Sequence, residues 1–338
     1  MPVMSHAESV SKWFEDPEIR EAKARELASS GDYAQIIGSL NEIGLLEEQT
    51  ERVYTKFRDN LEHSSFIGEN ELEMLAVVDL YSEVLSEHSV STYEIAKNKV
   101  NRLKLGDNTL IEIIQSEDVD LDEFYRACLF HDIGKITLTH AVHDNKIDRS
   151  SWLTLARDHG FGDKLEQGHT PDAVIPIHLI LEEEELVELE ERGISRDATF
   201  REIIQTHESA SRNILHSLGF VKEAIIAGQH HNYNNEELVY PISSQSIGVS
   251  AHMSDLIHLA DVESALGSNR AYLREWSHLS ILKQLIDHAE KGMVSSKILT
   301  ALWVEDEIAS VEDAGDGNND SDLLQDINEF IKSYLYNV

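Results

Sequence analysis

Cysteine and proline are both scarce in this chain of 338 residues. With Cys128 as its one cysteine, the sequence has no disulfide framework and no metal site built from cysteine pairs. Its five prolines interrupt few segments, and apolar residues recur with helical spacing through most of the chain. The sequence therefore predicts an all-α fold.

Basic residues are far outnumbered by acidic ones, and long apolar runs are absent from the sequence. The chain has 28 basic and 63 acidic residues, a net charge of −35, and such a surface repels nucleic-acid polymers and anionic membranes. The first residues lack the apolar core of a signal peptide. No apolar run approaches the ~20 residues that a membrane span requires. We expect a cytoplasmic protein with no nucleic-acid or membrane partner, in which bound metal supplies the positive charge that a phosphate-bearing substrate needs.

Three regions can be distinguished along the chain. Residues 1–70 form short predicted helices without recognisable chemistry, and we expect a regulatory or dimerisation region there that could make the protein a homodimer. Residues 71–300 carry every motif of interest. Residues 301–338 are predicted to be an acidic linker followed by a C-terminal helix. Any catalytic activity is therefore expected in the central region.

The segment FYRACLFHDIGKI has an adjacent histidine and aspartate on a predicted apolar helix face. His131 follows Cys128 on that face, and Asp132 lies beside it. A single such pair would most simply be an ion pair. It can also offer a nitrogen and a bridging carboxylate to two metal ions. Gly134 permits a close backbone approach, and Lys135 lies about one helical turn from His131.

Four more sites place ligand-type side chains one turn after apolar residues. Val84 precedes His88 in this way, and Ile204 precedes His207. Any one of these residues could be an ordinary buried core residue. Together they make seven ligand-type side chains on apolar faces, with nitrogen and carboxylate donors that suit iron, manganese, zinc or nickel. These side chains are His88, His131, Asp132, His207, His230, His231 and Asp261.

The order H…HDxxK…H…HH…D resembles the HD-GYP family of metal-dependent phosphodiesterases, which cleave cyclic di-GMP. The similarity extends over residues 75–298 and includes LFHDIGKI, TFREIIQTHESASRNILHSLGF (199–220) and IHLADVESALGSNRAY (257–272). The resemblance implies an HD-domain helical bundle that hydrolyses a cyclic dinucleotide with metal-activated hydroxide.

The resemblance also implies a role for each site residue. One metal ion is expected on His88, His131, Asp132 and Asp261, and a second on Asp132, His207, His230 and His231. Asp132 would bridge the two ions, and iron or manganese is the expected metal. Lys135 would face the substrate phosphate, with Tyr240 and Arg270 as further substrate contacts. Asp132 and Lys135 are therefore the predicted catalytic residues.

Two departures from the family pattern bear on the number of ions and on the substrate. Val84 stands where three-metal members place a glutamate, so two ions are expected. The segment HHNYNNEELVYP keeps Tyr240 and Pro241 but lacks the glycines of the family loop. The sequence therefore leaves two alternatives open: an HD-type enzyme acting on another nucleotide or phosphoester, and a non-catalytic regulator that senses a nucleotide.

The gap between His131 and His207 is long, and residues 145–195 are interpreted as an insertion. His159 lies within it, after an apolar face that includes Trp152 and Leu155, so it competes with His207 as the third histidine ligand. The sequence after His207 continues in register to His230. We therefore predict that His207 is the ligand.

Overall fold

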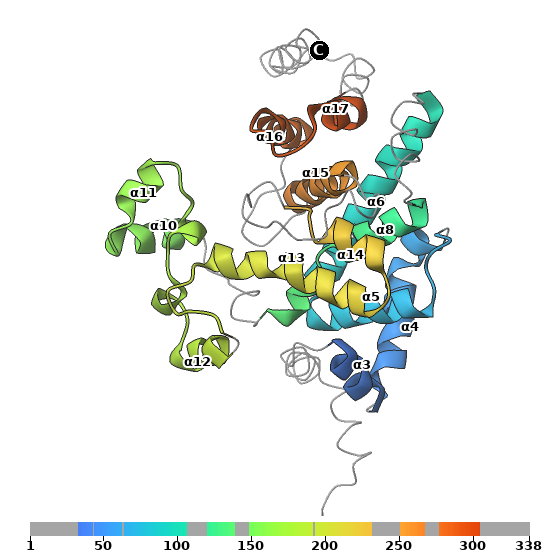
Figure 1. The fold of residues 1–338 in the computed structure, drawn as a ribbon, viewed down its shortest axis with the longest axis horizontal. Coiled ribbons are helices and arrows are strands. Elements are labelled where there is room, and N and C mark those ends of the chain that lie inside the picture. The colour runs from blue at the N-terminus through green and yellow to red at the C-terminus, as the bar shows by residue number, and fades with distance from the viewer. Residues whose placement is uncertain are drawn as a thin grey trace, which may run out of the picture. The chain divides into compact units, whose positions relative to one another are not determined.

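The described chain is helical throughout (Figure 1). The computed structural model describes residues 33–42, 44–62, 64–106, 120–138, 149–191, 193–231, 251–267 and 277–304. Within these ranges there is no β-strand, only an isolated bridge between Pro176 and Thr199. The predicted all-α fold is confirmed. Of the predicted acidic linker and C-terminal helix (301–338), only residues 301–304 lie within these ranges.

Two compact units divide the chain, and each combines two separate stretches. The first unit is Met1–Ser86 with Asp132–Ile214, and the second is Glu87–His131 with Leu215–Val338. The chain passes between them within helix α6 (Glu83–Gly106), at the His131–Asp132 peptide bond, and within helix α13 (Phe200–Ser217).

The first unit begins with α3 (Tyr33–Glu42), α4 (Leu45–Leu61) and α5 (Glu69–Tyr81). Helix α4 packs on both α3 and α5. The buried Asp79 of α5 accepts hydrogen bonds from Gln49 of α4 at 2.6 Å and from Ser86 at 2.6 Å, and Lys56 lies 3.1 Å away. These contacts meet the carboxylate's charge, which would be costly to bury without partners.

Helix α5 ends at Tyr81 because Ser82 adopts an extended backbone conformation (φ −160°, ψ 117°). The Tyr81 hydroxyl donates a hydrogen bond to the backbone carbonyl of Leu138 at 3.1 Å. Leu138 directly follows the 3-10 turn η1 (Ile133–Thr137), which also contacts α5. Helix α5 therefore fixes the turn that begins immediately after Asp132.

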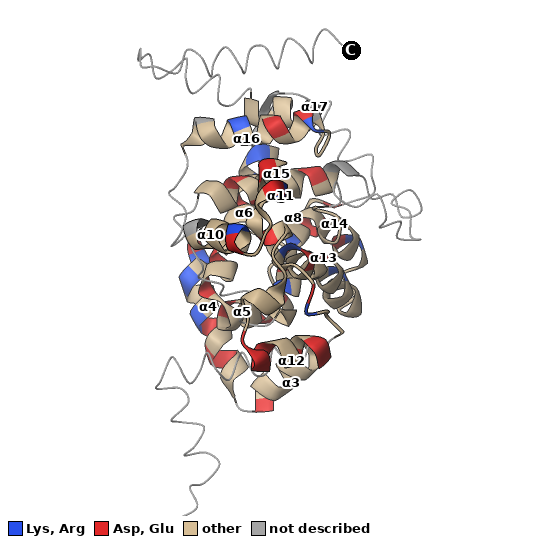
Figure 2. Cartoon of the chain, turned by 90° about the vertical axis from the view of Figure 1, so that its left-hand side faces the viewer, with Lys and Arg blue, Asp and Glu red and all other residues tan. Residues whose placement is uncertain are grey.

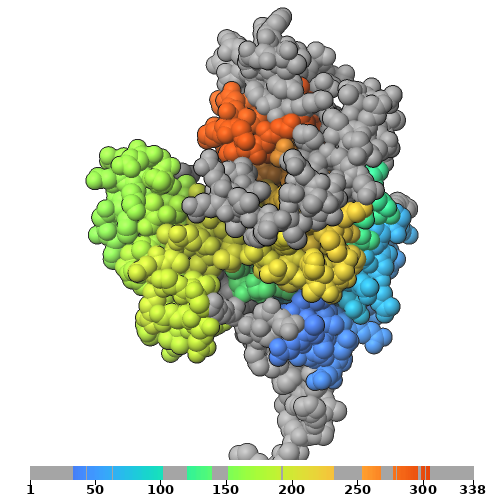
Figure 3. Space-filling model, viewed as in Figure 1, coloured from blue at the N-terminus to red at the C-terminus, as the bar shows by residue number. Residues whose placement is uncertain are grey.

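The predicted insertion folds into short helices of the first unit, shown in yellow-green in Figure 3. A buried apolar cluster joins Ile177, Leu186 and Leu189 to Phe200, the first residue of α13. The rings of Trp152 and Phe200 lie edge to face with centroids 5.1 Å apart. The insertion therefore packs against the start of α13. Its elements are α10 (Arg149–Asp158), α11 (Gly162–Glu166), η2 (Pro171–Ala173), η3 (Ile177–Leu179) and α12 (Glu183–Glu191), whose glutamates are red in Figure 2.

The start of α13 is stabilised by reciprocal capping. The Glu202 side chain accepts a hydrogen bond from the Thr199 amide at 2.7 Å, and the Thr199 hydroxyl accepts one from the Glu202 amide at 3.3 Å. This arrangement satisfies two amide groups that a helix start otherwise leaves without partners. It also fixes the residue at which α13 begins, and with it the position of His207 along the helix.

The second unit holds most of α6, the end of α13, and the remaining helices. Helix α8 packs on α14, where Arg126 forms an ion pair with Glu223 and lies over the Phe220 ring at 4.9 Å. Helix α15 contacts α14, α16 and α17, and Ser254 donates to the Ile226 carbonyl at 3.1 Å. These elements are α8 (Leu121–Phe130), α14 (Val221–Ala227), α15 (Ala251–Gly267), α16 (His278–Glu290), α17 (Ser296–Leu299) and the π-helical turn η6 (Thr300–Val304).

Among the described helices, none combines the length and the apolar character that crossing a membrane would require.

Candidate metal centre

The HD pair lies at the end of α8. The helix begins with a capping box, in which Asp120 accepts a hydrogen bond from the Asp122 amide at 2.7 Å, and it ends at Phe130. His131 is the C-cap residue and Asp132 follows it, and both are buried. The two ligand-type residues thus occupy the end of the helix, where the chain turns into η1.

Three of the predicted histidine ligands share one local geometry. In each, ring nitrogen Nδ1 faces the backbone carbonyl three residues earlier. His131 contacts Cys128 at 2.8 Å, and His230 contacts the carbonyl of Ala227 at 2.5 Å. His207 contacts the carbonyl of Ile204 at 2.5 Å.

A carbonyl can only accept a hydrogen bond, so Nδ1 carries the proton in these three rings. Nε2 is then the nitrogen that would bind a metal ion, after losing any proton that it shares with a neighbouring carboxylate in the metal-free chain. His88 also has its Nδ1 on a protein group, the Ser264 hydroxyl at 2.9 Å. Hydrogen bonds of this kind typically fix the orientation of metal-binding histidines.

Asp261 of α15 is the centre of the second unit's ligand-type residues. Its Oδ1 lies 2.8 Å from Nε2 of His88 and 3.7 Å from Nε2 of His131, and its Oδ2 lies 3.9 Å from Nε2 of His231. His88, His131 and Asp261 each offer a ligand atom within 4.8 Å of the others. Two ligand atoms that each lie about 2.1 Å from the same metal ion are about 3 Å, or slightly more, from each other. These spacings therefore suit a common ion.

Charge also favours a cation at this position. Burial by itself would raise the pKa of Asp261, but hydrogen bonds and charges from His131 and His88 outweigh it and lower the pKa well below its usual range. The carboxylate is therefore anionic at neutral pH. A buried anion surrounded by imidazoles is a donor set that transition-metal ions prefer.

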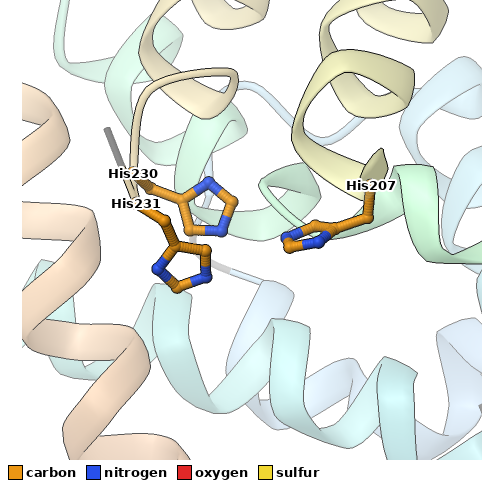
Figure 4. Close-up of side chains that lie close together, drawn as sticks. All are labelled: His207, His230 and His231. Atoms are coloured by element: carbon orange, nitrogen blue, oxygen red, sulfur yellow. The ribbon is translucent and has the colours of Figure 1, made fainter. Parts of the chain in front are cut away.

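His230 and His231 follow the end of α14. Their side chains are drawn in Figure 4, with their ring centroids 4.1 Å apart. The His131 ring lies 4.9 Å from that of His230, edge to face. Five of the seven predicted ligands thus gather within the second unit: His88, His131, His230, His231 and Asp261.

The other two predicted ligands meet within the first unit. Nε2 of His207, drawn on α13 in Figure 4, lies 3.0 Å from Oδ1 of Asp132. Lys135 forms a close ion pair with Oδ2 of the same carboxylate. The Ser211 hydroxyl accepts a hydrogen bond from the Gly134 amide at 2.8 Å and ties η1 to α13. A single peptide bond joins Asp132 to His131. The ligand-type residues of the first unit are therefore covalently adjacent to those of the second unit.

The donor set fits a divalent transition metal without sulfur. Nitrogen and carboxylate oxygen are the groups present, and no cysteine occurs in the ligand groups found among the described residues. Burial raises the pKa of the Cys128 thiol well above its usual value, so this side chain acts as a core residue. The described structure therefore contains buried His/Asp clusters that could hold metal.

Three functional neighbours were missed by the sequence reasoning: Ser264, Ser211 and His258. His258 and Ser264 stand three residues before and after Asp261 on α15, so helical spacing could have identified both. His258, His231 and Asp261 form another group whose ligand atoms lie within 4.8 Å of one another. Burial is the main cause that lowers the pKa of His258 to about 4, so this ring is neutral at pH 7.

Several residues singled out in the sequence are exposed or lie outside the described residues. His159 is exposed after the end of α10, whereas His207 is buried. The apolar faces proposed for two ligands are incomplete, because Val84 is 60% exposed and Ile204 is 36% exposed. Tyr240 and Arg270, the predicted substrate contacts, lie outside the described residues.

Comparison with known proteins gives one match. Searches of curated proteins and of solved structures returned none. The family model of the HD domain matches residues 85–189, a stretch that contains His88, His131 and Asp132, and this match supports placing the chain in the HD-domain superfamily.

Proposed function

We propose that this protein is a metal-dependent phosphodiesterase that hydrolyses a cyclic dinucleotide such as cyclic di-GMP. The HD domain is a family of metal-dependent phosphohydrolases, which supports the reaction class. The observation that carries the proposal is the position of the HD pair. His131 lies with His88 and Asp261, while the next residue, Asp132, pairs with His207.

Two ions would share these ligands. His88, His131, Asp132 and Asp261 would hold one, and Asp132, His207, His230 and His231 would hold the other. When bound, the ions lower the pKa of a shared water enough to give hydroxide near neutral pH, and they polarise the phosphoryl group. Iron or manganese is the proposed metal, because the donors are nitrogen and oxygen.

The protein's own residues orient the ions and meet the substrate's charge. Asp132 could contribute to both ions, because its present partners, His207 and Lys135, approach different oxygens of its carboxylate. The Lys135 ammonium is partly buried and would compensate negative charge that develops on the phosphoryl oxygens. The anchored Nδ1 atoms prevent ligand rings such as His131 and His230 from rotating.

A different phosphoester substrate is the second candidate. The observation that favours it is the segment 232–241, which lacks the glycines that the resemblance associates with cyclic di-GMP hydrolysis. Residues 1–70 are further proposed to regulate the enzyme or to join two copies of it.

A substrate panel tests the reaction and its specificity. Protein loaded with manganese or ferrous iron should hydrolyse cyclic di-GMP to the linear dinucleotide, and chelation should stop the reaction. Bis(p-nitrophenyl) phosphate serves as a simple phosphodiester for comparison. Assays should span low and molar salt, because screening relieves repulsion in a chain with a net charge of −35. Cleavage of the simple diester alone would support the second candidate, and binding of cyclic dinucleotides without cleavage would favour a regulator.

The choice between His207 and His159 predicts different mutational effects. His207→Ala should remove one metal ion and abolish turnover, because this buried ring lies 3.0 Å from the bridging carboxylate. His159→Ala should leave both unchanged, because its side chain is exposed. Metal content by elemental analysis and turnover with cyclic di-GMP measure the two effects. If His159→Ala caused the metal loss, the ligand assignment would be wrong.

A further inference from the structure

Two residues of helix α15 contact opposite sides of the His88 ring. Nε2 of His88 lies 2.8 Å from Oδ1 of Asp261, and Nδ1 lies 2.9 Å from the Ser264 hydroxyl. Asp261 and Ser264 are three residues apart, so they lie on the same face of the helix. All three residues are buried and belong to the second unit. Helix α15 therefore holds this ring of α6 between a carboxylate and a hydroxyl.

Ser264 also contacts the main chain of His88. Its hydroxyl donates to the His88 carbonyl oxygen at 3.5 Å, a longer contact than the one to the ring. A serine inside a helix commonly bonds a carbonyl of its own helix three or four residues earlier. The hydrogen bonds that Ser264 forms with described residues go instead to His88. This hydroxyl therefore joins α15 to α6 at the ligand-type residue itself.

The anchor of His88 differs in kind from the anchors of three other histidines. His131, His207 and His230 each contact a backbone carbonyl three residues earlier, and a substitution at that position leaves the carbonyl in place. The anchor of His88 is a side chain, which a single substitution removes. A hydroxyl can either donate or accept a hydrogen bond, so this contact does not depend on which ring nitrogen carries the proton.

A metal ion would affect the two contacts of the His88 ring unequally. In the proposed function, Asp261 and Nε2 of His88 bind the same ion, so bonds to the metal replace the direct contact between them. The Ser264 hydroxyl lies at the other ring nitrogen, away from the ion, and its contact can persist. Ser264 is therefore suited to hold the ring in the metal-free and in the metal-bound chain.

We propose that Ser264 is a positioning residue for the first ion, which orients His88 without touching the metal. This inference rests on the proposed function, in which His88 and Asp261 bind that ion. Hydrogen bonds to the second nitrogen of a ligand histidine typically contribute about 10- to 100-fold to metal affinity. Loss of the Ser264 hydroxyl should therefore weaken the first ion and leave the second unchanged.

Zinc titration of the full chain in competition with a chromophoric chelator tests this role, because it measures binding without turnover. Ser264→Ala should weaken one zinc ion by about 10- to 100-fold and leave the affinity for the other unchanged. Ser264→Thr and Ser264→Val form a pair of nearly equal shape, in which only threonine keeps the hydroxyl. The threonine variant should retain most of the affinity that the valine variant loses. Equal affinities in this pair would contradict a role for the hydroxyl.

Ser254→Ala is the control for helix packing. Ser254 is another buried serine of α15, and its hydroxyl donates to the Ile226 carbonyl of α14 at 3.1 Å. Both alanine variants lose a hydrogen bond between helices, so both should unfold at a lower temperature than the wild type. Zinc affinity should fall in Ser264→Ala alone. An equal fall in Ser254→Ala would mean that the packing of α15, and not the orientation of His88, determines the affinity.

A double-variant cycle shows whether Ser264 acts through His88. His88→Ala removes the ligand itself, so adding Ser264→Ala to it should not weaken zinc binding further. This cycle uses the smaller alanine side chain at position 264, so it remains informative if the valine and threonine variants do not fold. A further loss of about tenfold in the double variant would show that Ser264 acts elsewhere, and would overturn the proposal.

The outcomes separate this inference from the proposed function. If the wild-type chain binds no zinc, the proposed metal centre fails and the positioning role fails with it. If the wild type binds two zinc ions and Ser264→Ala binds both equally tightly, the metal centre stands and the positioning role is wrong. Weakening of both ions in Ser264→Ala would also contradict the proposal, because His88 is assigned to one ion only.

Discussion

Replacing Asp132 with alanine should lower turnover by about a thousandfold or more and remove most of the bound metal. Asp132 is the one residue proposed to contact both ions. Metal ions supply several kcal/mol of transition-state stabilisation, and each 1.4 kcal/mol corresponds to roughly a tenfold change in rate. His88→Ala should cost less metal, because His88 is proposed to contact one ion only. Elemental analysis and turnover of the purified variants measure both effects.

Two controls distinguish ligation from folding. Asp132→Asn keeps the shape of the side chain but supplies a poor bridging ligand, so it should lose metal nearly as completely as Asp132→Ala. Asp79→Asn changes another buried carboxylate of the first unit, one held by Gln49, Lys56 and Ser86. It should lower stability and leave the metal content unchanged. Equal metal loss in His88→Ala and Asp132→Ala would argue against a bridging role.

Gly134→Ala should destabilise the protein by about 3 kcal/mol or more. A Cβ atom at this position would overlap the backbone carbonyl of His207 and the backbone amide of Ser211. Backbone atoms cannot move aside as flexible side chains do, so the cost should lie at or above the upper end of the usual 1–3 kcal/mol for overpacking. Urea unfolding followed by circular dichroism measures the difference.

Gly38→Ala is the matched control for Gly134→Ala. Gly38 lies inside α3, and a Cβ atom added there would have nothing within 4 Å. Alanine at this position should raise the free energy of unfolding by about 0.5–1 kcal/mol, because it is the better helix former. A Gly134→Ala variant as stable as the wild type would mean that η1 and α13 are not packed as closely as described.

The fold class could be predicted from the sequence because helical periodicity is a local property. The apolar face of α8 is an example, with Phe124 and Cys128 buried as the spacing predicts. Element boundaries were less predictable. The sequence suggested that Val84 lies on an apolar helical face one turn before His88, but α6 begins only at Glu83, after the extended residue Ser82 that ends α5. The register of α6 is therefore independent of Tyr81, and Val84 points to solvent.

The sequence placed the ligand-type residues on buried faces, and all but the partly exposed His231 are buried, but their partners could not be predicted. His131 and His207 use carbonyls three residues earlier, a local contact that helical geometry allows. Other contacts join residues that are distant in the sequence. The His88–Ser264 hydrogen bond and the His258–His288 hydrogen bond depend on how separate helices pack. No pattern within a single sequence segment indicates such pairs.

The insertion illustrates the same limit. Its length and position were predicted from the gap between His131 and His207. Its own apolar cluster was not, because Ile177 and Phe200 meet only when short helices fold back on the start of α13. His159 lies on an apolar face that resembles that of His207, so periodicity alone could not separate them. Burial separates them, since His207 is enclosed and His159 is exposed.

The central claim, that the HD pair and its neighbours form a two-metal phosphohydrolase centre, is tested most directly by counting bound ions. Protein reconstituted anaerobically with ferrous iron, or with manganese, and then freed of excess metal should retain about two ions per chain. Elemental analysis against protein concentration gives this number. A chain that retains no ion under either condition would contradict the account.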